Sequence, residues 1–327
     1  MNALPFSVIT GFLGSGKTTL LSRLLRHPAF ERTAVIINEF GAVGLDHLLV
    51  ESSDEQILLL EGGCVCCTVR GDLVRTAGDL LARRAAGAVT AFERIVIETT
   101  GLADPAPIVH ALMTDRNIAD ALRLESVITT VDAAAGAATL DAHPESVKQA
   151  ALADCIVVTK SDLADPAATG LAARLQALNP TAPKLAAMHG AVDAAQLFDG
   201  RAYDPARYDP ALFKTAAHRH GGINTFCLRR EKPLHAATLS LFLQLVAEHC
   251  GAKLLRLKGL IDVVESPGRP AVIHGVQHVF HPPAWLDQWP DEDHSTRIVV
   301  ISQGLEAQWL QDVLEILEKE VNACSIS

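Results

Sequence analysis

The chain has 327 residues and a formal net charge of −10, because 28 lysine and arginine residues stand against 38 aspartate and glutamate residues. Hydrophobic residues make up 49% and charged residues 20%, a composition that excludes wholesale disorder and suits two domains with sizeable cores. No apolar run nears the roughly 20 residues of a membrane span, no secretory signal is visible, and the balance is acidic, so we expect a cytoplasmic protein that binds neither membranes nor nucleic acid.

The first half of the chain alternates apolar runs with stretches of helical periodicity. Strands of nearly continuous Val, Ile and Leu are typical of parallel sheets that are covered on both faces. We therefore predict a doubly wound, mostly parallel α/β domain. Its expected strands are residues 6–10, 34–37, 56–60, 94–97, 126–131 and 155–159, and its expected helices include 18–25, 72–84 and 147–153.

A dense run of turn-forming residues between 198 and 222 indicates a linker. Beyond it, strands at 223–230, 253–264, 271–280 and 297–302 accompany helices at 236–250 and 305–321, which predicts a smaller α+β domain. The expected organisation is a nucleotide-binding domain over residues 1–205, a linker over 206–222 and the second domain over 223–327.

The segment 11–18 reads GFLGSGKT and matches the P-loop pattern G-x-x-x-x-G-K-[ST] between a predicted strand and a predicted helix. The agreement of pattern and context disfavours a glycine turn with a chance lysine. Main-chain N–H groups and the helix N-terminus would hold the phosphates. Lys17 is expected on the β- and γ-phosphates, the Thr18 hydroxyl on Mg²⁺ and Thr19 near the α-phosphate. The predicted nucleotide contacts here are Gly11, Gly14, Ser15, Gly16, Lys17, Thr18 and Thr19.

A P-loop also needs a carboxylate at the end of a neighbouring strand. The strand 94–97 leads into Glu98-Thr99-Thr100-Gly101. Glu98 is the candidate to hold Mg²⁺, directly or through water, and the Gly101 N–H is the candidate contact to the γ-phosphate. Lys17, Thr18, Glu98 and Gly101 form the predicted catalytic set; an ordinary strand-end turn is the alternative for the last two.

The segment Thr159-Lys160-Ser161-Asp162 follows a predicted strand and indicates guanine recognition. The Asp162 carboxylate can accept two hydrogen bonds from the N1–H and N2–H₂ edge of guanine, a pair of donors that adenine lacks, so GTP should be preferred. The Lys160 stem would lie along the base. GTPases usually have asparagine where this chain has Thr159, so the side-chain amide of that asparagine is absent here. Asp132, at the end of another predicted strand, is a further candidate for the nucleotide site.

Three of the seven cysteines, Cys64, Cys66 and Cys67, fall within four residues after the strand 56–60. A disulfide scaffold would be short and secreted, so a reducing compartment is expected. Thiolates favour a transition-metal site, and the close spacing favours a pair of ligands, Cys66 with Cys67 or Cys64 with Cys66, completed by residues from elsewhere. A redox pair between Cys64 and Cys67, or three inert thiols, are the alternatives that remain open.

The order and spacing of these segments resemble the CobW family of metal-chaperone GTPases, and within it the YjiA-like branch. The resemblance rests on residues 11–19, 38–41, 62–67, 98–101 and 159–162, continues through 256–260, 274–277 and 294–296, and covers essentially the whole chain. It implies a P-loop NTPase fold and GTP hydrolysis coupled to the handling of Zn²⁺ or Co²⁺. It also implies that Glu39, Cys64, Cys66 and Cys67 hold the transition metal.

Two departures from the family pattern concern metal binding. Many relatives place a second acidic residue after the segment Asn-Glu-Phe-Gly, where this chain has Ala42. Many also carry a long histidine-rich loop between the domains, of which only His218-Arg219-His220 remains, so metal storage there is not expected. His274 and His278 are expected on one strand face, where histidines are more often satisfied polar groups than ligands.

The resulting hypothesis is a nucleotide-controlled metallochaperone. GTP and Mg²⁺ would order the segments near 38–46 and 98–105, and this ordering would create the metal site; hydrolysis would release the metal to a client protein. No glutamine or arginine is clearly placed to help hydrolysis, so turnover alone should be slow, and a homodimer is compatible with this hypothesis. The alternative is a regulatory GTP-binding protein, or an activator of the nitrile hydratase or cobalamin type, in which the metal is structural or is cobalt. A metabolic kinase is a third, less favoured class.

Overall fold

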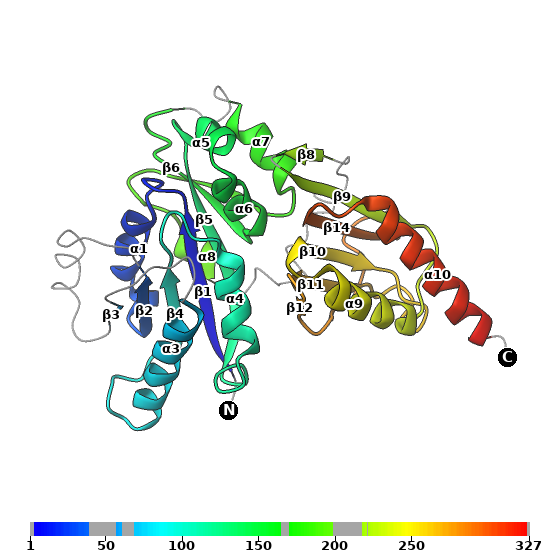
Figure 1. Cartoon of the computed structure of the whole chain (residues 1–327), viewed down its shortest axis with the longest axis horizontal. Helices are drawn as coiled ribbons and strands as arrows, with labels where there is room; N and C mark the ends of the chain where they lie inside the picture. The colour runs from blue at the N-terminus through cyan, green and yellow to red at the C-terminus, as the bar shows by residue number, and fades with distance from the viewer. Residues whose placement is uncertain are drawn as a thin grey trace. The chain divides into compact units, whose positions relative to one another are not determined.

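The structure, a computed structural model, describes residues 3–38, 57–60, 69–164, 170–198, 218–220 and 222–325. Glu39, Cys64, Cys66 and Cys67, which were predicted to hold the transition metal, lie outside these ranges. The chain divides into two compact units, residues 1–172 with 182–202, and residues 173–181 with 203–327. Each unit has its own sheet (Figure 1). The boundaries of the linker at 206–222 stay a prediction.

The sheet of the first unit has the strand order β3-β2-β4-β1-β5-β6-β7. All pairings among these described strands are parallel, which confirms the predicted doubly wound α/β fold. The strands are β1 (Leu4–Gly11), β2 (Thr33–Asn38), β3 (Ile57–Leu60), β4 (Arg94–Glu98), β5 (Leu122–Asp132), β6 (Cys155–Thr159) and β7 (Lys184–Ala187). Since β1 lies between β4 and β5, three strand ends that carry predicted site residues meet at one edge.

Helices cover both faces of this sheet (Figure 1). They are α1 (Lys17–Leu25), α3 (Val69–Ala85), α4 (Pro105–Thr114), α5 (Gly136–Ala142), α6 (Pro144–Leu152) and α8 (Ala194–Phe198). Helix α7 (Leu171–Leu178) begins at the end of residues 1–172, and its residues from Ala173 on belong to the second unit. On one face, Ile9, Ile128 and Val157 pack with residues of α1 and α8 in a single apolar core. Their neighbours Val8 and Val127 point to the other face, are also fully buried, and belong to the strands that α4 and α6 contact.

The second unit is an antiparallel sheet with two long helices. Its sheet has the order β12-β11-β10-β14-β9-β8, with β13 on β11. The elements are β8 (His218–His220), β9 (Ile223–Arg230), α9 (Ala236–Cys250), β10 (Leu254–Ile261), β11 (Ala271–Val276), β12 (Val279–Phe280), β13 (Ala284–Trp285), β14 (Thr296–Gln303) and α10 (Ala307–Ser325). Phe226, Leu257 and Val300 on one face of the sheet form a core with Phe242 of α9 and Leu310 of α10. This arrangement confirms the predicted α+β domain.

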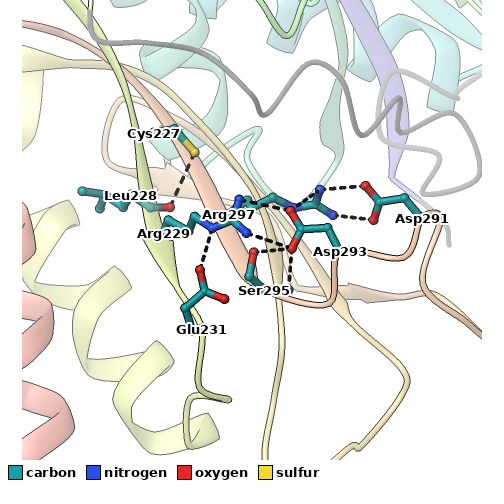
Figure 2. Close-up of polar contacts among 8 residues, drawn as sticks. All are labelled: Cys227, Leu228, Arg229, Glu231, Asp291, Asp293, Ser295 and Arg297. Atoms are coloured by element: carbon teal, nitrogen blue, oxygen red, sulfur yellow. Dashed lines mark hydrogen bonds and ion pairs between the residues drawn. The ribbon is translucent and has the colours of Figure 1, made fainter.

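The other face of this sheet buries positive charge. Arg297 has no exposed surface, and its guanidinium donates two parallel hydrogen bonds, of 2.8 and 2.9 Å, to the two carboxylate oxygens of Asp291 (Figure 2). Asp293 accepts a further bond from Arg297 at 3.4 Å and also pairs with Arg229. Such two-pronged pairing satisfies a buried guanidinium in a fixed geometry. Burial raises the pKa of the neighbouring Cys227 thiol to about 11, which keeps it protonated at neutral pH.

One expected strand is divided. The apolar run 271–280 predicts a single strand, but β11 ends at Val276 and β12 begins at Val279. Gln277 between them has a φ of 52°, a turn conformation that reverses the chain into an antiparallel pair. The prediction that His274 and His278 share a strand face is therefore wrong, because His274 lies on β11 and His278 lies in the turn.

Candidate functional site

The P-loop joins β1 to α1 at the edge where the parallel strands end. Gly11 is the last residue of β1, Gly14 lies in the turn, and Gly16 caps α1. The φ of Gly16 is 91°, a left-handed conformation that glycine adopts without strain and that turns the chain into the helix. Ser15 is buried, and its hydroxyl lies 2.6 Å from the Thr130 hydroxyl of β5. The loop is thus fixed to the sheet before any phosphate binds.

Lys17 and Thr18 are the first two residues of α1, as the P-loop pattern predicts. The Lys17 ammonium donates to the Phe12 carbonyl at 3.2 Å, so it folds back over the loop that it follows. Lys17 is 8% exposed. The Thr18 hydroxyl donates to Glu98 Oε1 at 2.7 Å. Thr19 follows in α1, beside a cavity of about 280 Å³ lined by Thr18, Thr19, Ser22, Arg23, Arg26 and His189.

Glu98 ends β4 and is 5% exposed. The loop after it, residues 99–104, is here called the β4–α4 loop. Its first residue is fixed to β1, because the Thr99 hydroxyl donates to the Thr10 hydroxyl at 2.9 Å and the Thr99 N–H donates to the Ile9 carbonyl. Gly101 lies so close to the P-loop that a Cβ there would be 2.6 Å from the Leu13 nitrogen. The structure therefore brings Lys17, Thr18, Glu98 and Gly101 to one place.

The segment predicted to recognise the base begins at the last residue of β6. Thr159, where GTPases usually have asparagine, donates from its hydroxyl to the Ser15 carbonyl at 2.7 Å. This bond ties the segment to the P-loop, so the threonine supplies a link of its own despite the missing amide. Asp162 lies in the turn, with Oδ2 3.9 Å from His189 Nε2.

Asp132, at the end of β5, holds the neighbouring lysine of this segment. The Lys160 ammonium lies 2.6 Å from Asp132 Oδ2, and Lys160 has a φ of 54°. Asp132 Oδ1 also accepts from the N–H groups of Ala134 and Ala135. Burial raises the pKa of the Asp132 carboxyl, but these hydrogen bonds outweigh burial and lower it overall. Asp132 is thus ionised at neutral pH and positions the Lys160 stem.

The predicted transition-metal residues cannot be placed, since Glu39 and the cysteine cluster lie outside the described residues. Within the described part of the chain, no three His, Cys, Asp or Glu side chains come together as a metal site would require. His274 is 3% exposed, and burial followed by the charges of Lys258 and Arg256 lowers its pKa well below the ordinary value. A neutral, buried His274 is a structural residue of the second unit.

Comparison with known proteins identifies the family that this geometry belongs to. Residues 5–186 match the family model of the CobW/HypB/UreG nucleotide-binding domain, and residues 223–317 match the cobalamin synthesis protein cobW C-terminal domain. The chain belongs to the CobW/HypB/UreG family. It is a GTPase.

Relatives match the chain over nearly its whole length. It is 32% identical to the zinc chaperone YjiA of Escherichia coli, over 92% of this chain and 94% of that protein. It is 33% identical to the zinc chaperone CobW of Pseudomonas aeruginosa, over 93% of this chain and 88% of that one. The crystal structure of Zn(II)-bound YjiA GTPase from E. coli superposes with a TM-score of 0.70 at 26% identity, over 97% and 99% of the two chains. These matches confirm the resemblance to the CobW family.

Among the described residues, no helix is both long enough and apolar enough to cross a membrane.

Sequence reasoning missed one side chain of this site. Gln149 of α6 has no exposed surface and donates to the carbonyls of Gly101 and Ala103 in the β4–α4 loop. It lies 48 residues from Gly101 in the sequence, within an ordinary amphipathic helix. No local pattern marks it, because its role depends on which helix packs beside the loop.

Proposed function

We propose that this GTPase is a metallochaperone that binds Zn²⁺, with Co²⁺ as the alternative cargo, and transfers it to a client protein under nucleotide control. The observation that carries the proposal is the direct bond between Thr18 of the P-loop and Glu98, the residue before the β4–α4 loop, in a chain whose relatives are named zinc chaperones. This bond joins the place of hydrolysis to a segment that can change when GTP becomes GDP.

Magnesium fits the donor set at this place. The Thr18 hydroxyl and the Glu98 carboxylate are hard oxygen donors that lie within hydrogen-bond distance of each other, the ligand type that Mg²⁺ prefers. When bound, Mg²⁺ would neutralise charge on the β- and γ-phosphates. Lys17 would contact the same phosphates, and the Gly101 N–H would contact the γ-phosphate.

Guanine selectivity is assigned to the segment after β6. Asp162 would accept from the N1–H and N2–H₂ groups of guanine, while Lys160, held by Asp132, would lie along the base. Thr159 keeps this segment in register with the P-loop through Ser15. Phosphate and base recognition are then parts of one connected framework.

The cargo site is assigned to Glu39, Cys64, Cys66 and Cys67. Thiolates bind Zn²⁺ and Co²⁺ well, and a carboxylate can complete the ligand set. The segment that carries Glu39 follows β2, the strand next to β4, so a change at Glu98 has a short route to it. We propose that GTP favours the metal-holding arrangement, that hydrolysis releases the metal to the client, and that hydrolysis is slow until the client or a second copy binds.

The test compares Zn²⁺ affinity in two nucleotide states. Calorimetric titration with GDP and with a non-hydrolysable GTP analogue should give affinities at least about tenfold apart, because binding of metal and nucleotide must be reciprocal. Cys66→Ala should weaken Zn²⁺ binding and leave nucleotide binding intact. The matched control is Cys324→Ala, at an exposed cysteine of α10, which should change neither. Equal Zn²⁺ affinities in the two states would overturn the coupling and favour a regulatory GTPase with a structural metal.

A further inference from the structure

The buried side chain of Gln149 in α6 forms two hydrogen bonds with the β4–α4 loop. The Gln149 amide nitrogen donates to the Gly101 carbonyl at 3.1 Å and to the Ala103 carbonyl at 3.0 Å. Both partners are carbonyl oxygens, which only accept hydrogen bonds. The NH₂ group of Gln149, and not its amide oxygen, must therefore face them. Both donors are used, and both hold the loop that contains the candidate γ-phosphate contact.

Gln149 is itself held in place by the sheet. Its main-chain carbonyl accepts from the Thr129 hydroxyl of β5 at 2.7 Å, and the residue has no exposed surface. Its side chain also lines a small cavity of about 40 Å³ that Phe12, Leu13 and Ser15 of the P-loop line too. A side chain fixed in this way transmits the position of β5 and the P-loop to the β4–α4 loop.

The β4–α4 loop also lies very close to the P-loop at Gly101. With Leu13 so near, residue 101 can only be glycine unless the loop moves away from the P-loop. The far end of the loop is also fixed, since Asp104 caps α4 and lies 3.4 Å from the ammonium of Lys148, the residue next to Gln149. Helix α6 thus contacts the loop through two adjacent side chains, one fully buried and one partly exposed.

We propose that Gln149 is the positioning residue that pre-forms the γ-phosphate contact, and that it thereby sets the preference of the protein for GTP over GDP. The inference rests on the assignment of Gly101 in the proposed function. A loop held in its binding position loses little conformational freedom when the γ-phosphate arrives. Without the two bonds, GTP must order the loop as it binds, whereas GDP, which lacks a γ-phosphate, carries no such cost.

The experiment measures the affinities of GDP and a non-hydrolysable GTP analogue by fluorescent-nucleotide binding, with Mg²⁺ and without Zn²⁺. In Gln149→Leu, which has a similar volume and no donors, GTP-analogue affinity should fall about tenfold, as expected for two lost neutral hydrogen bonds, while GDP affinity stays within about twofold. Gln149→Asn keeps the amide but is too short to reach both carbonyls, and should lose a smaller part of the same preference. It preserves the test if the leucine variant does not fold.

Three further variants give matched comparisons. Lys148→Met removes only the surface contact from the same helix and should leave both affinities within about twofold. Gly101→Ala pushes the loop from the P-loop and should reproduce the selective loss of GTP-analogue binding. Asp132→Asn perturbs the base segment and should weaken both nucleotides equally.

Equal losses for both nucleotides in the Gln149 variants, or no loss, would overturn the inference. Because Zn²⁺ is absent from these measurements, that outcome is separate from a failure of the proposed metal coupling.

Discussion

Both units bury side chains that can ionise, but the hydrogen bonds of these side chains differ between the units. In the second unit, Arg297 is paired with Asp291 and Asp293 of its own chain in a two-pronged geometry (Figure 2). In the first unit, the buried ends of Lys17 and Glu98 contact a main-chain carbonyl and a threonine hydroxyl of the P-loop region. In the proposed function, phosphate and Mg²⁺ would bind at Lys17 and Glu98, whereas Arg297 is held by carboxylates of its own chain.

The difference distinguishes a buried charged residue that stabilises the fold from one that binds a ligand. Removal of one partner of a buried ion pair strongly lowers the free energy of unfolding, because the other charge stays buried without compensation. A buried cation placed for a ligand often contributes little to stability, because such a residue is placed for function and not for stability. The same kind of substitution should therefore affect stability in one unit and affinity in the other.

Lys17→Met should give the largest effect on affinity. The variant loses charge-assisted contacts to two phosphates, so GTP affinity should fall roughly 100-fold or more and hydrolysis should be lost. The free energy of unfolding without nucleotide should stay the same or rise by up to about 1 kcal/mol. Fluorescent-nucleotide binding and urea unfolding measure the two quantities. A fall in stability as large as the fall in binding free energy would contradict the assignment of Lys17 to the ligand.

Arg297→Leu should give the converse result. It removes the guanidinium that pairs with Asp291 and Asp293 and should lower the free energy of unfolding by about 3 kcal/mol, with GTP affinity unchanged. Urea unfolding followed by tryptophan fluorescence is suitable, because Trp285, Trp289 and Trp309 are the only tryptophans and all belong to the second unit.

The control for this variant is Arg269→Leu. Arg269 pairs with Asp287 at the surface, where both side chains are more than half exposed, so its loss should leave unfolding unchanged. If Arg297→Leu and Arg269→Leu lower the free energy of unfolding equally, then burial does not make the Arg297 pair more stabilising than the exposed Arg269 pair.

Much of the first unit could be predicted from the sequence because its signals are local. The strands β1, β4 and β6 are largely apolar runs, and the P-loop is a fixed pattern at a strand-to-helix turn. These features need no knowledge of distant contacts, and the positions of Lys17, Thr18 and Glu98 follow from them. The segment after β6 was equally visible, but its bond from Thr159 to Ser15 was not, since it joins loops 144 residues apart.

Other features depend on packing between distant elements. Gln149 lies in a helix like any other until α6 is placed beside the β4–α4 loop. The division of residues 271–280 into β11 and β12 was missed because the apolar pattern continues through the turn, and only the conformation of Gln277 breaks it. The burial of Arg256 and Lys258 beside His274 likewise follows from the register of β10 and β11.

His274 offers the finest test of the comparison, because it is a buried group whose charge the second unit excludes. Its pKa is lowered in the folded state, while the unfolded chain should have an ordinary value of about 6.5. As the pH falls below about 6.5, the unfolded state takes up a proton that the folded state does not, so stability decreases. The expected slope approaches about 1.4 kcal/mol per pH unit for one proton. His274→Gln should reduce this slope in urea unfolding between pH 6.5 and 5. Between pH 7.5 and 8.5 the slopes of the two proteins should agree, and an unchanged slope at low pH would show that another group excludes the proton.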